Sequence, residues 1–217
     1  MSFFGLDAPS TAARFGGQIP GTPAPGPELV RGAVGGAVMS VGGFAPWAFA
    51  GRILVEAVGE AGFYSVCALA FIGLSGIALH RLLIGTGSLW RFYKLFTAGF
   101  LAYSAAWIAG WMALRGDAGS LAGLGGGALA MALVFGGAFG TPHRIVAAAL
   151  WLFAPAAAGY FLGGIAEGKA MASADSRAMR IAAMLLWGLC YGIGLGIGIA
   201  GAIHACQAAV LAKIRAR

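Results

Sequence analysis

Charged residues are scarce in this sequence: Asp, Glu, Lys and Arg make up only 10% of its 217 residues, while hydrophobic residues make up 60%. A water-soluble domain usually carries roughly a quarter of its residues charged. The shortage of charge argues against a water-soluble fold and predicts that lipid surrounds most of the chain. Because a bilayer holds no water to satisfy backbone groups, the spans must be helices or a closed barrel. Long apolar runs without alternation favour helices.

Motifs that carry chemistry are also missing. No ionisable residue lies at the centre of a predicted span, where ion-coupled transporters usually place one. We find no phosphate-binding GxxxxGK[ST] loop, no nucleophile beside a base and no carboxylate pair within a span. The sequence therefore predicts a protein that is not an enzyme, without catalytic residues. The sequence does not indicate whether the protein binds a cofactor, which stays unknown.

Metal ligands have no recognisable spacing. The three cysteines lie in apolar or span-end positions without a CxxC pair, and they are Cys67, Cys190 and Cys206. Three histidines, His80, His143 and His204, are predicted at the same side of the membrane, which permits a shared metal or haem site. No HxxxH or HExxH spacing supports that site. We therefore expect interfacial histidines, packing cysteines and no metal centre.

The first 28 residues have a composition of their own. Prolines alternate with glycines from Pro9 to Pro27, and the segment lacks the basic start and apolar core of a cleavable signal. We expect residues 1–28 to form a Pro/Gly-rich tail. Residues 18–28 are predicted to be polyproline-like or disordered when alone in water, because they bury too little apolar surface to offset their ordering entropy.

Six apolar segments follow the tail within residues 29–212, and each approaches the roughly 20 residues that a helix needs to cross a bilayer. Polar breaks place these spans at about 32–51, 62–83, 95–114, 120–139, 145–165 and 179–205. Pro46 is expected to kink the first span, and residues 213–217 form a basic end. Residues 35–38 resemble residues 126–129, but the spans that follow do not align. An inverted repeat therefore stays an open alternative.

Positive charge gathers on one predicted side. With six spans, that side holds nine of the fourteen Lys and Arg residues, whereas the opposite side carries equal numbers of basic and acidic residues. Short positive loops remain cytoplasmic, so both termini are predicted there, most simply at a bacterial inner membrane with an organellar membrane as the alternative. The net charge of +7 follows from this asymmetry. It does not indicate nucleic-acid binding, for which the chain has no basic and aromatic patch.

Glycine is abundant, with 38 copies, many of them four residues apart within spans. Such stripes let helix backbones approach closely, which drives helix association in lipid. The stripes that we predict to be helix-packing faces comprise Gly123, Gly127, Gly136, Gly140, Gly188, Gly192 and Gly196. Packing within the chain and packing onto a partner, either another membrane subunit or a second copy, are both open.

Aromatic and hydroxyl side chains share one face of the third span. They are Tyr103, Ser104, Trp107 and Trp111. Buried indole and phenol groups need hydrogen-bond partners. A pore or ligand could use this face, although helix-to-helix hydrogen bonding is its more ordinary use.

Two functions remain from this evidence. The glycine faces and the lack of functional polar groups favour a non-catalytic structural or assembly subunit of a larger membrane complex. The alternative is a small channel or facilitator-type transporter for a neutral solute or ion, which would use the third-span aromatic face. A membrane enzyme or a haem- or metal-binding subunit ranks behind both.

Overall fold

The computed structural model describes residues 3–16 and 18–216 and contains only helices and connecting segments over these residues. A short helix, α1 (Ala8–Phe15), precedes α2 (Pro25–Leu79), α3 (Ser88–Leu114), α4 (Gly116–Phe139), α5 (Ile145–Ala172) and α6 (Arg177–Arg215). Single 3-10 turns, His80–Leu82 and Pro142–Arg144, follow α2 and α4. The five long helices are apolar and long enough to span a membrane. The predicted all-helical class is confirmed over the described residues, with five helices that could span a membrane.

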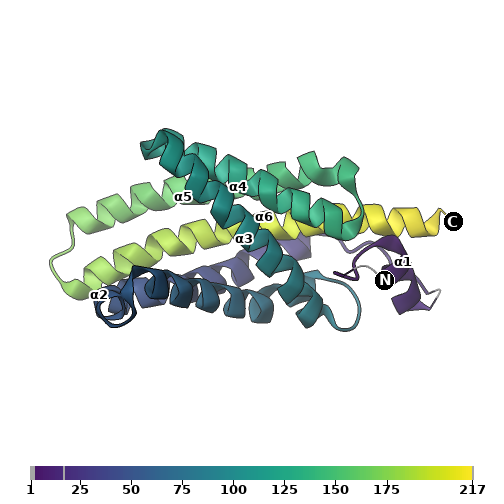
Figure 1. Cartoon of the computed structure of the whole chain (residues 1–217), viewed down its shortest axis with the longest axis horizontal. Helices are drawn as coiled ribbons and strands as arrows, with labels where there is room; N and C mark the ends of the chain where they lie inside the picture. The colour runs from purple at the N-terminus through teal and green to yellow at the C-terminus, as the bar shows by residue number, and fades with distance from the viewer. Residues whose placement is uncertain (1–2, 17, 217) are drawn as a thin grey trace.

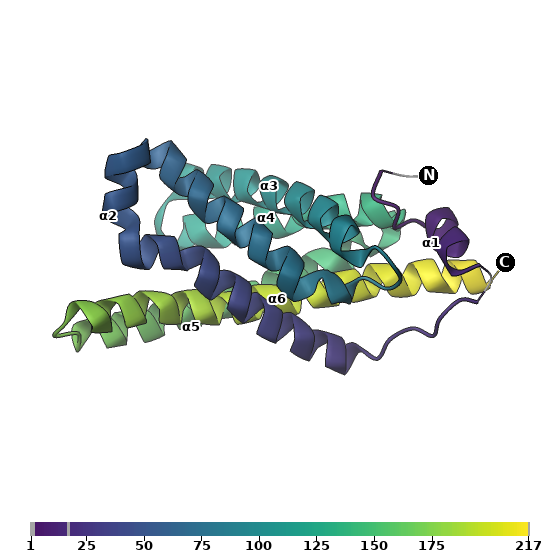
Figure 2. The same cartoon turned by 90° about the horizontal axis from the view of Figure 1, so that it is seen from below.

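Helix α2 carries the first two predicted spans. Its helical geometry is interrupted at Gly59, where φ is 72° and ψ is 172°, a conformation that residues with a Cβ rarely adopt. Figure 2 shows α2 running away from the chain ends, turning and coming back. We call residues 25–58 the first arm and residues 60–79 the return arm. The six predicted spans therefore lie on five helices.

Several predicted boundaries match the helices. The third predicted span ends with α3 at Leu114, the fourth ends with α4 at Phe139, and the fifth begins with α5. Gly140 ends α4 in the left-handed conformation, with φ of 64°. Other boundaries were set too short: α3 begins at Ser88 rather than 95, and α6 continues to Arg215 rather than 205. Hydropathy locates only the apolar part of a helix, and both of these helices continue past it into polar sequence.

The predicted Pro/Gly-rich tail contains the short helix α1. Asp7 accepts a hydrogen bond of 3.0 Å from the Ser10 amide at the start of α1, which satisfies one free amide of the first turn. Residues 25–28, which the sequence placed in the tail, form the first turn of α2 in the whole chain. Proline is well suited to the first helical turn, where its missing amide would have no partner.

Side chains of the long helices hold the tail in place. Lys94 donates a 2.7 Å hydrogen bond to the carbonyl of Phe3. Arg215, at the other end of the chain, donates to the carbonyl of Pro20 at 2.6 Å. The tail is therefore attached to α3 and α6 of its own chain.

The long helices contact one another in a closed order, α2–α6–α5–α4–α3 and back to α2. Helix α1 and the C-terminal end of α6 lie at one end of the bundle (Figure 1). We call this the terminal end. We call the opposite end the distal end, where α2 turns back and where α3 meets α4 and α5 meets α6.

Two polar side chains secure the connection between α2 and α3 at the terminal end. The Arg91 guanidinium donates hydrogen bonds of 2.8, 3.1 and 2.9 Å to the carbonyls of residues 84–86. The buried Gln207 amide donates to the Leu82 carbonyl at 2.8 Å and accepts from the Ile84 amide at 3.0 Å. Buried backbone groups are costly without partners, so these contacts fix the turn against α3 and α6.

Candidate functional site

Four glycines bring the first arm of α2 against α6. A Cβ added to Gly196 would meet the carbonyl oxygen of Gly32 and would lie 2.7 Å from the Cα of Gly36. A Cβ on Gly192 would meet the Gly36 carbonyl in the same way. Backbone atoms of the two helices, with the small side chains of Ser40 and Ala200, fill this contact, which we call the glycine seam (Gly32, Gly36, Gly192 and Gly196). Close van der Waals contact of this kind is the main attraction between helices in lipid.

The other predicted packing glycines also face atoms of their own chain. Their nearest neighbours are Trp107 for Gly123, Tyr103 for Gly127, Ile145 for Gly136 and Phe44 for Gly188. Gly140 differs from the rest, because it ends α4 and is not part of a packing stripe. The contacts of these glycines thus account for the predicted faces without a second polypeptide.

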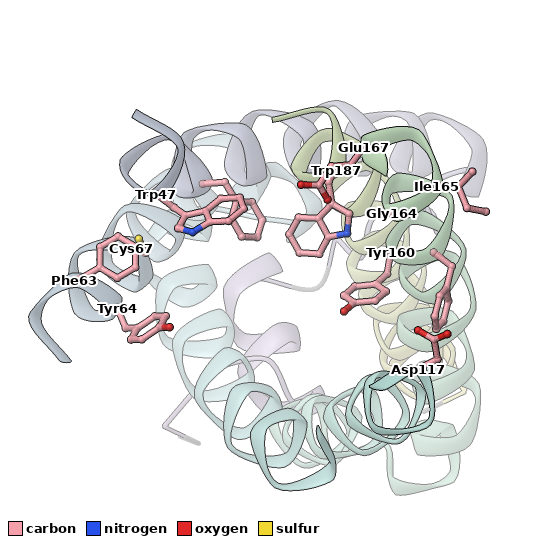
Figure 3. Close-up of a pocket in the computed structure, with 12 residues that line it drawn as sticks. Trp47, Phe63, Tyr64, Cys67, Asp117, Tyr160, Gly164, Ile165, Glu167 and Trp187 are labelled. Atoms are coloured by element: carbon pink, nitrogen blue, oxygen red, sulfur yellow. The ribbon is translucent and has the colours of Figure 1, made fainter. Parts of the chain in front are cut away.

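A cavity of about 850 Å³ opens at the distal end among α2, α4, α5 and α6. We call it the outer chamber. Most of its lining is aromatic, comprising Phe44, Trp47, Phe63, Tyr64, Tyr160, Phe161 and Trp187. Figure 3 shows the rings of Trp47, Tyr160 and Trp187 arranged around its opening. The volume lies in the range of sites that bind small organic molecules.

A second cavity of about 460 Å³, the inner chamber, adjoins the first. The two chambers share five lining residues, Phe44, Tyr64, Cys67, Tyr160 and Trp187. The inner chamber continues between the return arm and α3, where Leu101 and Ile108 are both exposed and line it. Lipid in contact with these two residues therefore lies beside the chamber.

Two tyrosine hydroxyls meet beside the inner chamber. The hydroxyls of Tyr103 and Tyr191 are 3.0 Å apart, and the side chains are only 6% and 9% exposed. One hydroxyl donates to the other, so the hydrogen of the accepting hydroxyl has no acceptor among the described residues. The inner chamber therefore offers this hydroxyl, beside the polar groups of Tyr64, Ser104, Trp107, Tyr160 and Trp187, within a largely aromatic and apolar lining.

Stacked phenylalanine rings close the inner chamber toward the terminal end. Phe71 and Phe100, which both line the chamber, have ring centroids 5.1 Å apart. Phe96 and Phe92 continue this stack and are fully buried. The chambers thus form a vestibule that is open at the distal end and closed by aromatic packing at its other end.

The predicted third-span face is divided between two environments. Tyr103, Ser104 and Trp107 line the inner chamber, whereas Trp111 does not. The Trp111 ring stacks on Trp107 and lies 4.5 Å from the Arg115 guanidinium carbon. Trp111, one helical turn beyond Trp107, therefore lies outside the inner chamber.

Sequence reasoning missed most of the vestibule. Its lining comes from separate helices, as Phe44, Tyr160, Trp187 and Tyr191 illustrate. The spacing of Trp187 and Tyr191, one helical turn apart, was the one available signal, and their rings do stack, with centroids 5.6 Å apart. That spacing alone does not distinguish a cavity wall from an ordinary packing face.

The histidines have separate partners. His204 contacts the buried Glu28 carboxylate at 2.7 Å and joins α6 to α2, while His80 lies 3.0 Å from the Ser88 hydroxyl. No group of three potential metal ligands exists in the part of the chain that the structure describes.

No protein-family model, curated protein or solved structure matches this chain. The fold and the site define its class directly: it is an all-helical protein with five helices able to span a membrane, and they surround an aromatic vestibule. Its activity must be inferred from that vestibule.

Proposed function

We propose that this protein is a non-catalytic, facilitator-type membrane protein that binds a small, largely apolar organic solute in the aromatic vestibule. The observation that supports this function best is the vestibule itself, with adjoining chambers of about 850 and 460 Å³. Sites of this size, lined by aromatic residues with few polar groups, suit small organic ligands. Because the lining offers few polar groups to replace a hydration shell, it does not suit a hydrated inorganic ion.

In this proposal the chain crosses the membrane six times. The two arms of α2 provide two crossings and the remaining long helices provide four. Both termini lie on the cytoplasmic side, where the positive charge gathers, in a bacterial inner membrane. The outer chamber then opens to the opposite side, and the Phe71–Phe100 pair separates it from the cytoplasm.

Passage of a solute requires the aromatic closure to open. The return arm and α3 hold Phe71 and Phe100 respectively, and a small separation of these helices would part the stacked rings. The Tyr103–Tyr191 pair supplies the hydrogen-bond donor that orients a carbonyl or ether oxygen of the solute. The remaining proposed contacts in the inner chamber are mainly with aromatic and apolar side chains.

The role of structural subunit stays a prediction. Its sequence argument was the glycine faces, and their contacts lie within the chain, so they give this role no particular support. Co-purification with other polypeptides at fixed stoichiometry from a native membrane would favour it.

The test of the proposed function is saturable binding of a neutral aromatic probe. We choose tritiated triphenylphosphine oxide, whose oxygen accepts a hydrogen bond, and measure its binding to purified protein by scintillation proximity. Ala68 lines the inner chamber, so A68F should fill it and abolish the saturable component. Ala154 is exposed on α5, and A154F is the matched control that should bind as wild type does. Equal binding by both variants, or no saturable binding by wild type, would overturn the proposal.

Transport is tested with the same probe. Proteoliposomes should take it up with a saturable component that protein-free liposomes lack, and A68F should remove that component. Uptake equal to that of protein-free liposomes would reduce the function to binding alone.

A further inference from the structure

The charges around the outer chamber are all of one sign. Asp117 and Glu167 line it, and no Lys or Arg lines either chamber. Figure 3 shows these two carboxylates on different helices around the same opening. Neither belongs to an ion pair, since the pairs within the described ranges are Arg52–Glu56 and Glu28–His204.

Three of the basic residues at the distal end, Arg52, Arg115 and Arg177, contact groups other than the two lining carboxylates. Arg52 is paired with Glu56 at 3.0 Å. Arg115 lies over the Trp111 ring, and Arg177 donates to the Phe49 carbonyl at 3.2 Å. The charged side chains that line the outer chamber are therefore both negative.

Aromatic rings provide the second attraction for a cation. The face of an aromatic ring carries partial negative charge, and organic cations bind against such faces, most strongly those of Trp. Trp47, Tyr160 and Trp187 belong to one chamber, and Trp187 packs edge-to-face with Tyr160 at 5.4 Å. The carboxylates and the rings of the outer chamber thus favour the same ligand class.

We propose that the solute bound in the vestibule is a lipophilic organic cation, for which Asp117 and Glu167 supply the attraction at the opening and the aromatic rings supply the binding surface. This inference rests on the proposed function and specifies its substrate class. A small inorganic cation does not fit, because the chambers provide few oxygen ligands to replace its water. A lipophilic organic cation, whose charge is spread over apolar groups, needs no such oxygen ligands.

The experiment compares three probes of similar shape and different charge. They are tetraphenylphosphonium (positive), triphenylphosphine oxide (neutral) and tetraphenylborate (negative), each measured by scintillation proximity on the full-length protein. Wild type should bind the cation about tenfold more tightly than the neutral probe and the anion most weakly. Two carboxylates several ångströms from a partly exposed cation account for a factor of this order.

Matched variants test whether the carboxylates that line the outer chamber cause the preference for the cation. D117N/E167Q removes both lining carboxylates and should weaken tetraphenylphosphonium binding by about fivefold to tenfold, without changing that of the neutral probe. E60Q/D175N removes two exposed carboxylates that line neither chamber and should leave all three affinities unchanged. Both variants change the net charge equally, so a general surface-charge effect would weaken cation binding in both and would overturn the inference.

A salt series on wild type repeats the test without a substitution. Raising the sodium chloride concentration should weaken binding of the cation and leave that of the neutral probe unchanged, because salt screens charges near the surface. Equal, salt-independent binding of cation and neutral probe would overturn the substrate class and leave the proposed function standing. Absence of saturable binding by all three probes would overturn both.

Discussion

Adding a single methyl group to the glycine seam should destabilise the protein measurably. In G196A the new Cβ would lie 2.7 Å from the Cα of Gly36 and would also meet the Gly32 carbonyl. Carbon atoms pack comfortably at about 3.5–4.0 Å, so α2 and α6 must separate by roughly 1 Å. The obstructing atoms belong to the backbone, so no side chain can rotate away to make room.

The magnitude follows from that separation. Inserting a methylene into a filled contact typically costs about 1–3 kcal/mol, and a gap of this size forfeits roughly a quarter to a half of each neighbouring van der Waals contact. We expect G196A to lose about 3 kcal/mol of unfolding free energy, at the upper end of that range. G36A/G196A should cost less than the sum of the single variants, because the first methyl already separates the helices.

The assay is unfolding of the purified protein by sodium dodecyl sulfate in mixed micelles, followed by far-UV circular dichroism. G137A is the control, because a Cβ at that position in α4 meets no atom within 4 Å. It should leave stability unchanged or raise it by up to about 1 kcal/mol through helix propensity. If G196A unfolded at the same detergent fraction as wild type, the close packing of the seam would be refuted.

Two further predictions concern the terminal end. Q207L should lower the unfolding free energy by about 2–4 kcal/mol, because it leaves the Leu82 carbonyl and the Ile84 amide buried without their partner; the same detergent titration measures it, and an unchanged midpoint would contradict the role of Gln207. D7A should cost α1 about 1 kcal/mol by removing the cap on the Ser10 amide. Limited proteolysis should then cut the tail faster while the midpoint of global unfolding stays the same.

The long helices can be predicted from the sequence because each is marked by its own apolar composition. Breaks at Leu114 and at Gly140 are legible, since a polar run and a glycine that adopts a positive φ end helices for local reasons. The break predicted between the first two spans, over residues 52–61, contains the turn at Gly59, but its exact position is harder to predict. A glycine between Val58 and Glu60 has the same appearance in sequence whether it continues a helix or interrupts it.

The vestibule could not be predicted because its parts are distant along the chain. Phe44, Tyr103 and Trp187 lie on three helices and line one chamber, yet each has the spacing of an ordinary packing residue. The position of the tail could not be predicted for a related reason. Its helix depends on Asp7 and its position on Lys94 and Arg215, and only the last two contacts are long-range.

The glycine seam joins the earliest transmembrane segment of the chain to the latest. In the proposed topology, the first arm of α2 is synthesised and inserted before Gly192 and Gly196, so its narrow face contacts lipid or another protein until α6 is in place. The hydrogen bond from Arg215 to the Pro20 carbonyl likewise forms only after the end of α6 has been synthesised. Completion of the final helix is therefore the event that closes the bundle, and a chain truncated within α6 would leave both the first arm and the tail without their native contacts.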